Sequence, residues 1–242
     1  REPTTAFSVV ARCAPDGHPL VIRNHPVDAD GNPFPTRYWL TCPDAVRAVS
    51  RLEADGAIAR WNERIGREPD LAEAVAAAHR AAATERASDL PAEVRVEGGV
   101  AGTRVGVKCL HAHLANHLAG GVDPVGAAVA AEVGPIHALP GSWTCVAAID
   151  QGTNSTRLLV VGAADAAAPT VELARDMVIT RLGQDVDASG RLADAAMDRA
   201  VATIDRFARR ARAIGAARVR VGATSAVRDA ANRDDLARRL AD

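Results

Sequence analysis

Aromatic residues, cysteines and long apolar runs are all scarce in this sequence. Aromatics make up 3% of the 242 residues and cysteines number four, although hydrophobic residues in total make up 48%. The cores must therefore be built from Ala, Val, Leu and Ile. No apolar run approaches the ~20 residues that a membrane-spanning helix needs, and there is no basic-then-apolar signal segment. We therefore expect no membrane partner. Because four cysteines without a secretory signal indicate reduced thiols, we also expect a cytoplasmic location.

An excess of charge of either sign is also missing. The chain has 29 basic and 30 acidic side chains, a net charge of −1. This balance gives no electrostatic case for a nucleic-acid partner. The length predicts one or two domains, and because the sequence begins at Arg1 rather than Met, we expect it to be a fragment of a longer chain.

The most informative stretch is residues 146–161, where two apolar runs flank a polar turn. Val146–Ile149 leads to Asp150, and Leu158–Val161 follows the turn. Both runs are too short for ordinary helices and rich in β-branched residues or Leu, which predicts strand, tight turn, strand. Gly152 allows the backbone to turn sharply and to approach a ligand closely.

The polar residues of this turn have the chemistry of a phosphate site. Thr153, Asn154 and Ser155 add hydroxyl and amide donors beside backbone N–H groups. Such a donor-rich, concave turn binds anions, phosphate above all. Asp150 at the strand end is placed to hold a hydrated Mg²⁺ against that phosphate. A plain hairpin with a polar turn explains the same pattern, and this alternative stays open.

A second polar group follows a later strand. The residues predict a helix over 193–214, with an apolar stripe at helical spacing, and then a strand over 218–223. Thr224 and Ser225 come at the carboxyl end of that strand, where ligands of α/β sheets gather. Arg228 follows and offers a bidentate donor to phosphate, unless a nearby carboxylate occupies it in a salt bridge.

In this order and spacing, the set resembles the start of the exopolyphosphatase and guanosine-pentaphosphate phosphatase family. That family belongs to the superfamily of sugar kinases, heat-shock chaperones and actin. The residues that carry the resemblance are Asp150, Gly152, Thr153, Asn154, Ser155, Arg157, Arg181, Leu182, Gly183, Thr224, Ser225, Arg228, Ala230 and Asn232. The resemblance implies an α/β fold over residues 146–242, an incomplete actin-like, ribonuclease H-like subdomain.

The resemblance also implies an activity. It is that of a phosphoanhydride hydrolase, which releases terminal phosphate from polyphosphate or guanosine pentaphosphate by metal-assisted attack of water. The implied catalytic residues are Asp150 and Arg228, and Asp150 would also hold Mg²⁺ or another divalent cation. The implied phosphate ligands are Gly152, Thr153, Asn154, Ser155, Thr224 and Ser225.

The family's second glycine-rich loop and its catalytic Glu would come after Asp242. We therefore expect the isolated chain to be inactive, and any homodimer to form through the part that the sequence lacks. The alternative is a non-catalytic regulatory or docking module with a phosphate-binding half-site.

Residues 1–137 are predicted to form an α+β domain, mostly helical with a short hairpin. The turn signal Asp16-Gly17 lies between two short apolar segments, which predicts the hairpin. Thr41 is expected to cap a helix that ends near Gly56. Further helices are expected over 70–88, 108–119 and 124–132. Pro140 and Gly141 predict a linker over 138–145.

This first half resembles a small family of unknown function from GC-rich bacteria, often encoded beside an exopolyphosphatase. The matching pieces are Val9–Cys13, Pro33–Pro43, Ser50–Glu53 and Val107–Ala112. The resemblance supplies no activity. It does imply that a chain carrying both halves is a fusion or a read-through product.

Thiols and imidazoles in the first half raise the question of a metal. On a helix, Cys109 and His113 share a face, as do His113 and His117, and Cys13 or Cys42 would have to complete a zinc site. No Cys-x-x-Cys pair is present. Buried thiols and surface histidines, including His111, explain the same residues. We therefore expect no tightly bound Zn²⁺ in residues 1–137.

Overall fold

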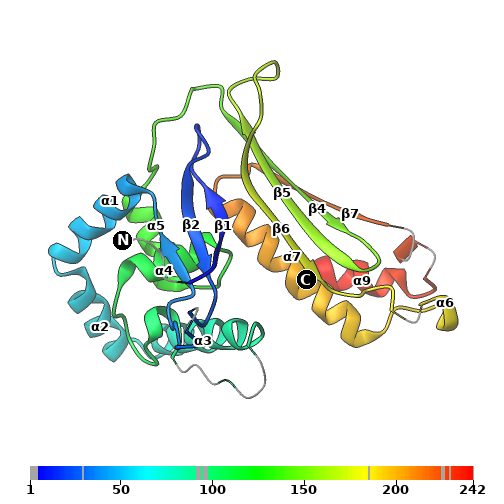
Figure 1. Cartoon of the computed structure of the whole chain (residues 1–242), viewed down its shortest axis with the longest axis horizontal. Coiled ribbons are helices and arrows are strands. Elements are labelled where there is room, and N and C mark those ends of the chain that lie inside the picture. The colour runs from blue at the N-terminus through cyan, green and yellow to red at the C-terminus, as the bar shows by residue number, and fades with distance from the viewer. Residues whose placement is uncertain are drawn as a thin grey trace. The chain divides into compact units, whose positions relative to one another are not determined.

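The chain divides into two compact units, Arg1–Leu139 and Pro140–Asp242, and each is described by itself (Figure 1). The division falls within the predicted linker, 138–145. The first strand of the second unit begins at Thr144, inside that stretch. The computed structural model describes residues 5–28, 30–90, 94, 98–184, 186–224, 227–228 and 230–241, with the backbone only at 187 and 188.

The first unit contains a three-stranded antiparallel sheet. Strands β1 (Phe7–Arg12) and β2 (Pro19–Asn24) form the predicted hairpin, which is confirmed. Strand β3 (Tyr38–Leu40) pairs with β2 and extends the sheet in the order β1-β2-β3. The sequence analysis did not predict this third strand, because its pairing with β2 overrides the proline-rich context of these residues.

In the described part of the first unit, five α-helices follow the sheet: α1 (Pro43–Ala54), α2 (Ala57–Arg67), α3 (Pro69–Ala87), α4 (Leu110–Leu118) and α5 (Pro124–Val133). A short 3₁₀ turn, η1, spans Val100–Gly102. The helix α2 was not predicted. The cap of α1 was predicted wrongly: Cys42 occupies that position, because Thr41 instead bonds to β2, its N–H to Leu20 and its hydroxyl to Pro19.

The core of the first unit gathers around α4, which packs against β3 and α5. Leu110 and Leu114 of this helix are fully buried, as are Val125 and Val129 of α5. Small and aliphatic side chains dominate this core, as the scarcity of aromatics requires.

The second unit is a four-stranded sheet in the order β6-β5-β4-β7. Strands β4 (Thr144–Gln151), β5 (Ser155–Ala163) and β6 (Val171–Ile179) form an antiparallel meander. The chain then passes through α6 (Val186–Ser189) and α7 (Asp194–Ala213) to β7 (Arg218–Ala223), which pairs with β4 in parallel. The helix α9 (Arg233–Ala241) follows. The predicted α/β fold class is confirmed.

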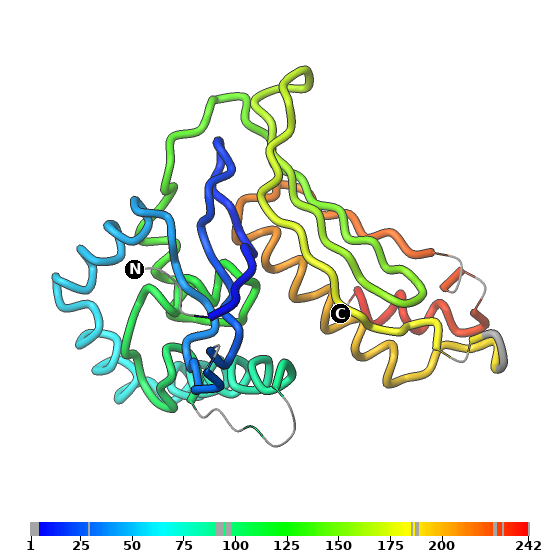
Figure 2. The backbone as a smooth tube through the Cα atoms, viewed as in Figure 1, coloured from blue at the N-terminus to red at the C-terminus, as the bar shows by residue number. Residues whose placement is uncertain are grey.

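One face of this sheet is covered by α7, which packs against β4, β5 and β7 (Figures 1 and 2). Burial alternates along β4, with Cys145, Ala147 and Ile149 buried and their neighbours exposed. The predicted stripe of α7 is confirmed: Met197, Ile204, Ala208 and Ala211 are buried. The helix therefore lies on the apolar face, and Asp150 lies on the other face.

Arg210, in the last turn of α7, has a fully buried side chain. Its Nη1 lies 2.7 Å from Oδ2 of Asp176 in β6. This ion pair fastens the helix to the sheet.

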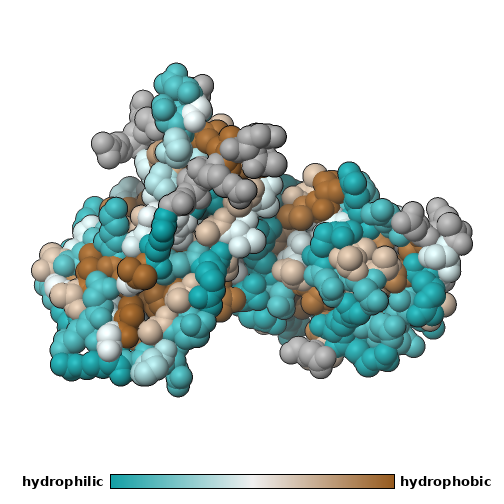
Figure 3. Space-filling model, turned by 90° about the horizontal axis from the view of Figure 1, so that it is seen from below, coloured by the Kyte–Doolittle hydropathy of each residue, from teal (hydrophilic) through white to brown (hydrophobic). Residues whose placement is uncertain are grey.

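Hydrophilic side chains cover much of the molecule in the view of Figure 3. Across the described residues, no helix has the length and hydropathy that crossing a bilayer requires.

Candidate phosphate-binding site

The predicted strand–turn–strand is confirmed, with β4 and β5 antiparallel from Thr144↔Ala163 to Gln151↔Thr156. The backbone N–H of Gly152 donates to the carbonyl of Ser155 at 2.9 Å and closes the turn. A Cβ on Gly152 would lie 3.1 Å from that carbonyl oxygen, so the close approach favours glycine. Thr153 and Asn154 are exposed at the tip, whereas Ser155 is buried as the first residue of β5.

The segment after β6 holds this turn in place. The carbonyl of Asn154 accepts from the N–H groups of Thr180 at 3.0 Å and Arg181 at 2.9 Å, and the carbonyl of Thr153 accepts from Gly183 at 2.8 Å. Arg181 has a φ of 48°, in the left-handed region that non-glycine residues seldom adopt. These bonds give Arg181 and Gly183 a structural reason to accompany the turn in the sequence.

A buried polar network beneath the turn was missed by the sequence analysis. The side-chain amide of Gln151 donates to the carbonyl of Gly152 at 2.8 Å and to the Thr180 hydroxyl at 3.3 Å. The Thr156 hydroxyl donates to the Gln151 amide oxygen and lies 3.1 Å from the Thr180 hydroxyl. Gln151 faces Thr156 in the hairpin register, so counting back from the tip would have paired them. The network fixes both strand ends relative to the tip.

Asp150 lies exposed at the end of β4, one residue before the network. In register, its neighbours are Arg157 on β5 and Gly222 on β7. Directly opposite residues share a face, so the exposed Arg157 lies on the same face as the carboxylate. Gly222 has no side chain, and no atom of the described residues lies within 4 Å of where its Cβ would be. Asp150 therefore has open space on the β7 side.

Thr224 brings the end of β7 to the same place. Its N–H donates to the carbonyl of Gln151 at 3.1 Å, and its hydroxyl lies 3.4 Å from that oxygen. The N–H of Arg228 donates to the carbonyl of Thr224 at 3.3 Å, so the exposed Arg228 begins the next turn. Ser225 lies outside the described residues. Figure 2 shows the hairpin tip and the end of β7 at one end of the sheet.

A shallow depression of about 430 Å³ adjoins the segment that holds the turn. Arg181 and Arg199 line it together with Ile179, Thr180 and Gln184. Arg199 comes from α7, and its Nε donates to the carbonyl of Thr180 at 3.2 Å. The depression thus places two guanidinium side chains close to the candidate site, a favourable setting for a polyanion.

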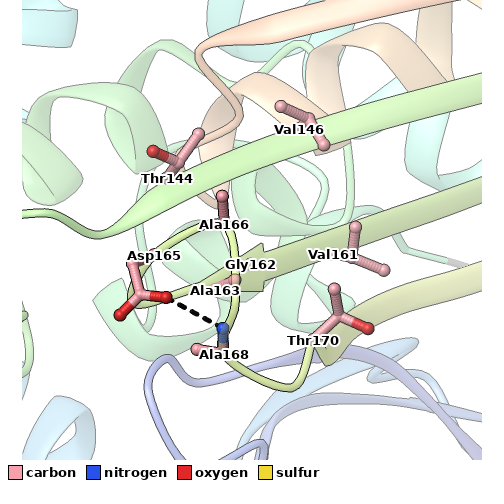
Figure 4. Close-up of a pocket in the computed structure, with 9 residues that line it drawn as sticks. All are labelled: Thr144, Val146, Val161, Gly162, Ala163, Asp165, Ala166, Ala168 and Thr170. Atoms are coloured by element: carbon pink, nitrogen blue, oxygen red, sulfur yellow. Dashed lines mark hydrogen bonds between the residues drawn. The ribbon is translucent and has the colours of Figure 1, made fainter.

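A second depression, drawn in Figure 4, lies at the opposite end of the sheet. It occupies about 300 Å³ beside the β5–β6 loop. Its carboxylate, Asp165, accepts hydrogen bonds from the N–H groups of Ala167 at 2.8 Å and Ala168 at 2.9 Å, the latter dashed in Figure 4. The loop therefore satisfies this carboxylate itself, and the depression is not part of the candidate site.

The metal-binding combinations weighed for the first unit do not form. His113 is fully buried, and its Nδ1 lies 2.9 Å from Oδ2 of Asp123. His117, the other histidine of that helix face, is partly buried, and burial lowers its pKa. A different set converges: Cys13, His18, Cys42 and His137. Only the two cysteines had been considered, and the spacing argument against Zn²⁺ does not apply to this set.

Comparison with known proteins divides the chain in a similar way. Residues 9–131 match the family described as "Protein of unknown function (DUF501)", and residues 160–242 match the "Ppx/GppA phosphatase family". Exopolyphosphatase 2 of Mycobacterium tuberculosis is 48% identical over 93 residues, which are 38% of this chain and 29% of that protein. Exopolyphosphatase 1 of Mycobacterium bovis is 38% identical over 92 residues, 38% of this chain and 26% of that protein.

Among solved structures, a Ppx/GppA family member from Aquifex aeolicus is similar to 40% of this chain and 31% of its own, with 26% identity and a TM-score of 0.38. The chain thus spans less than a third of the length of the curated relatives it matches. Because the first family match takes in more than half of the chain, the protein belongs to the DUF501 family, and its second unit carries a segment similar to Ppx/GppA phosphatases.

Proposed function

We propose that the second unit binds the terminal phosphates of inorganic polyphosphate at the β4–β5 turn, as one half of an exopolyphosphatase-type hydrolase. The observation that carries the proposal is the bond from the Thr224 N–H to the Gln151 carbonyl, which joins the end of β7 to the phosphate turn. The similarity to two mycobacterial exopolyphosphatases supports the choice of substrate class.

Each group at this end of the sheet has a role in the proposal. Backbone N–H groups of the turn and the Thr153 hydroxyl donate to phosphate oxygens, as donor-rich turns do. Thr224 orients the phosphate from the β7 side, and Arg228 balances its charge. The Gln151–Thr156–Thr180 network keeps these donors at fixed positions, so that little reorganisation is needed when charge develops.

Asp150 suits a divalent cation such as Mg²⁺. It is an exposed carboxylate at a strand end with open space toward Gly222, and Mg²⁺ binds through one or two carboxylates plus substrate phosphates and waters. When bound, such an ion supplies charge stabilisation on the transferred phosphoryl group.

Hydrolysis needs more than this half-site. Positioned acid–base groups typically contribute ~10²–10⁴-fold to a rate, and we assign no water-activating base within the matched segment. We therefore expect the chain to bind phosphate chains but to release phosphate far more slowly than the same chain joined to the remainder of a family domain.

The binding test uses calorimetry with short-chain polyphosphate and Mg²⁺. Asp150→Ala and Thr153→Val are expected to weaken binding at least about tenfold, or ~1.4 kcal/mol. Asp165→Ala is the matched control, because it removes a carboxylate from the far end of the same sheet. Equal affinities for Asp150→Ala and Asp165→Ala would remove the basis of the proposal. Competition between polyphosphate and guanosine pentaphosphate decides which of the two is preferred.

The second candidate is a regulatory or docking module that binds phosphate without hydrolysing it. The rate of phosphate release decides between the two candidates. If this chain joined to the remainder of a family domain releases phosphate no faster than this chain alone, the second unit is a binding module.

A further inference from the structure

Four side chains of the first unit converge from different segments. Cys13 follows β1, His18 precedes β2, Cys42 caps α1 and His137 follows α5. One donor atom from each lies within 4.8 Å of every other, and the Cys42 Sγ lies 3.3 Å from the His137 Nε2. A tetrahedral zinc site, with bonds of ~2.3 Å to sulfur and ~2.0 Å to nitrogen, needs donors about 3.3–3.8 Å apart. Small side-chain movements bridge the difference.

The backbone sets up this geometry. The N–H of Cys13 donates to the carbonyl of His18 at 2.8 Å, and the N–H of Gly17 donates back to the carbonyl of Cys13 at 2.8 Å. These bonds hold the first two side chains next to each other. Cys42 follows directly after Thr41, whose N–H donates to the carbonyl of Leu20 in β2 at 2.9 Å. The third side chain is therefore fixed against the same hairpin.

A carboxylate lies beside each imidazole, within hydrogen-bond distance for His18 and farther away for His137. The Nδ1 of His18 lies 2.6 Å from Oδ1 of Asp16, and the Nδ1 of His137 lies 3.7 Å from Oδ2 of Asp44. Metal-bound histidines commonly have such a carboxylate on the other ring nitrogen. The Nε2 of His18 is buried, with no hydrogen-bond partner among the described residues. A buried ring nitrogen of this kind needs a partner, and a metal ion supplies one.

Both sulfurs are buried, with Cys13 3% and Cys42 0% exposed. A thiol with no exposed surface is a poor nucleophile, so the geometry favours a ligand over a catalytic cysteine.

We propose that Cys13, His18, Cys42 and His137 bind one structural Zn²⁺. Two thiolates and two imidazoles are a donor set that selects zinc over magnesium or calcium. Four protein ligands complete the tetrahedron and leave no open position for catalysis. The ion would tie the β1–β2 turn, the start of α1 and the segment after α5 together. His137 lies beyond residues 9–131 of the family match, so a chain trimmed to that match would lack one ligand.

The first experiment measures metal in the full chain, purified without chelator from zinc-supplemented medium. One zinc per chain is expected by elemental analysis. After zinc is stripped under reducing conditions, Co²⁺ is added. Tetrahedral cobalt absorption with a sulfur-to-cobalt charge-transfer band is expected, because two thiolates bind the ion.

Variants locate the ion. Cys42→Ser and His137→Gln are expected to lose zinc, whereas Cys145→Ser, a buried free thiol of the second unit, and Cys109→Ser are the matched controls and should retain it. Asp16→Asn keeps all four ligands and should weaken binding about 10–100-fold, the usual effect of removing an orienting carboxylate. Asp44→Asn should weaken it less, because this carboxylate lies farther from its imidazole. The zinc affinity of these carboxylate variants tests the proposal even if a ligand variant fails to fold.

Three results would overturn the proposal. The first is a folded wild-type chain with no zinc and no cobalt uptake. The second is zinc retained at full stoichiometry by the folded double variant Cys42→Ser, His137→Gln. The third is a Cys13–Cys42 disulfide found by mass spectrometry in the folded chain under reducing conditions.

Discussion

Each unit begins its sheet with an antiparallel hairpin, and the two hairpins place their polar turn residues in opposite ways. The turn between β1 and β2 directs a buried thiol, Cys13, toward a second one, Cys42. The turn between β4 and β5 exposes Thr153 and Asn154 at its tip. Buried soft donors suit an ion that stays bound, whereas exposed hard donors suit a ligand that exchanges. The same motif thus presents its donors in the two ways that the two proposed sites require.

The largest stability effect is expected from the buried pair of the first unit. Asp123→Ala leaves His113, the Asn116 amide and the Gly126 N–H without their shared carboxylate. Each buried polar group left without its hydrogen-bond partner costs about 1–3 kcal/mol of unfolding free energy, and this change leaves three. Urea unfolding followed by Trp39 and Trp61, in a Trp143→Phe background, measures the first unit alone. Equal destabilisation of the second unit, followed by Trp143 in a Trp39→Phe, Trp61→Phe background, would show that the two units do not unfold separately.

The corresponding change in the second unit is Asp176→Ala. It leaves the guanidinium of Arg210 buried without this carboxylate, and we expect a loss of about 3 kcal/mol. Adding Arg210→Met should restore much of the stability, because an apolar side chain replaces the buried charge. Hydrogen exchange of α7 and β6 is the measurement. No recovery in the double variant would mean that packing, rather than charge burial, dominates here.

A pH effect is expected in the first unit. A contact with Cys109, followed by Glu53 and the Val46 carbonyl, raises the pKa of His111 from 6.5 to about 9. A group whose pKa is raised on folding stabilises the fold below its ordinary pKa and loses that contribution as pH rises through the folded value. Unfolding free energy should therefore fall between pH 6.5 and 9. His111→Gln should flatten this slope, and an unchanged slope in that variant would refute the assignment.

The smallest effect is expected on the surface of the second unit. Arg239 of α9 contacts Asp194 and Asp198 of α7. Exposed ion pairs contribute about 0.2–1 kcal/mol and weaken with salt. Arg239→Ala should lower the midpoint of thermal unfolding slightly in low salt and not measurably in high salt. A large loss would indicate that α9 is essential to the fold.

The sequence predicted what local patterns determine. The β4–β5 hairpin and α7 follow from alternation and helical spacing, and both formed where expected. Strand β3 was missed because its only reason to be extended is pairing with Val21–Arg23 of β2. The helix α2 was missed because Gly56, with a φ of 80°, ends α1 and also caps α2. In the sequence, this glycine indicated the end of the first helix and gave no separate indication that a second helix begins there.

The sites divide in the same manner. The β4–β5 turn is contiguous in sequence, so its hairpin could be predicted, and counting back from the tip also pairs Gln151 with Thr156. The proposed zinc ligands span residues 13 to 137, so they have no short-range spacing to detect. The helix that drew attention, α4, instead uses His113 to bind Asp123.

The strand β7 has a consequence for how the protein behaves at high concentration. It is an edge of the sheet in the part of the chain that the structure describes, and exposed edges recruit strands from other molecules. Arg218 and Arg220 alternate with Val219 and Val221 along it. Two like charges on each copy repel a second copy that approaches edge to edge, so these arginines disfavour aggregation through this edge.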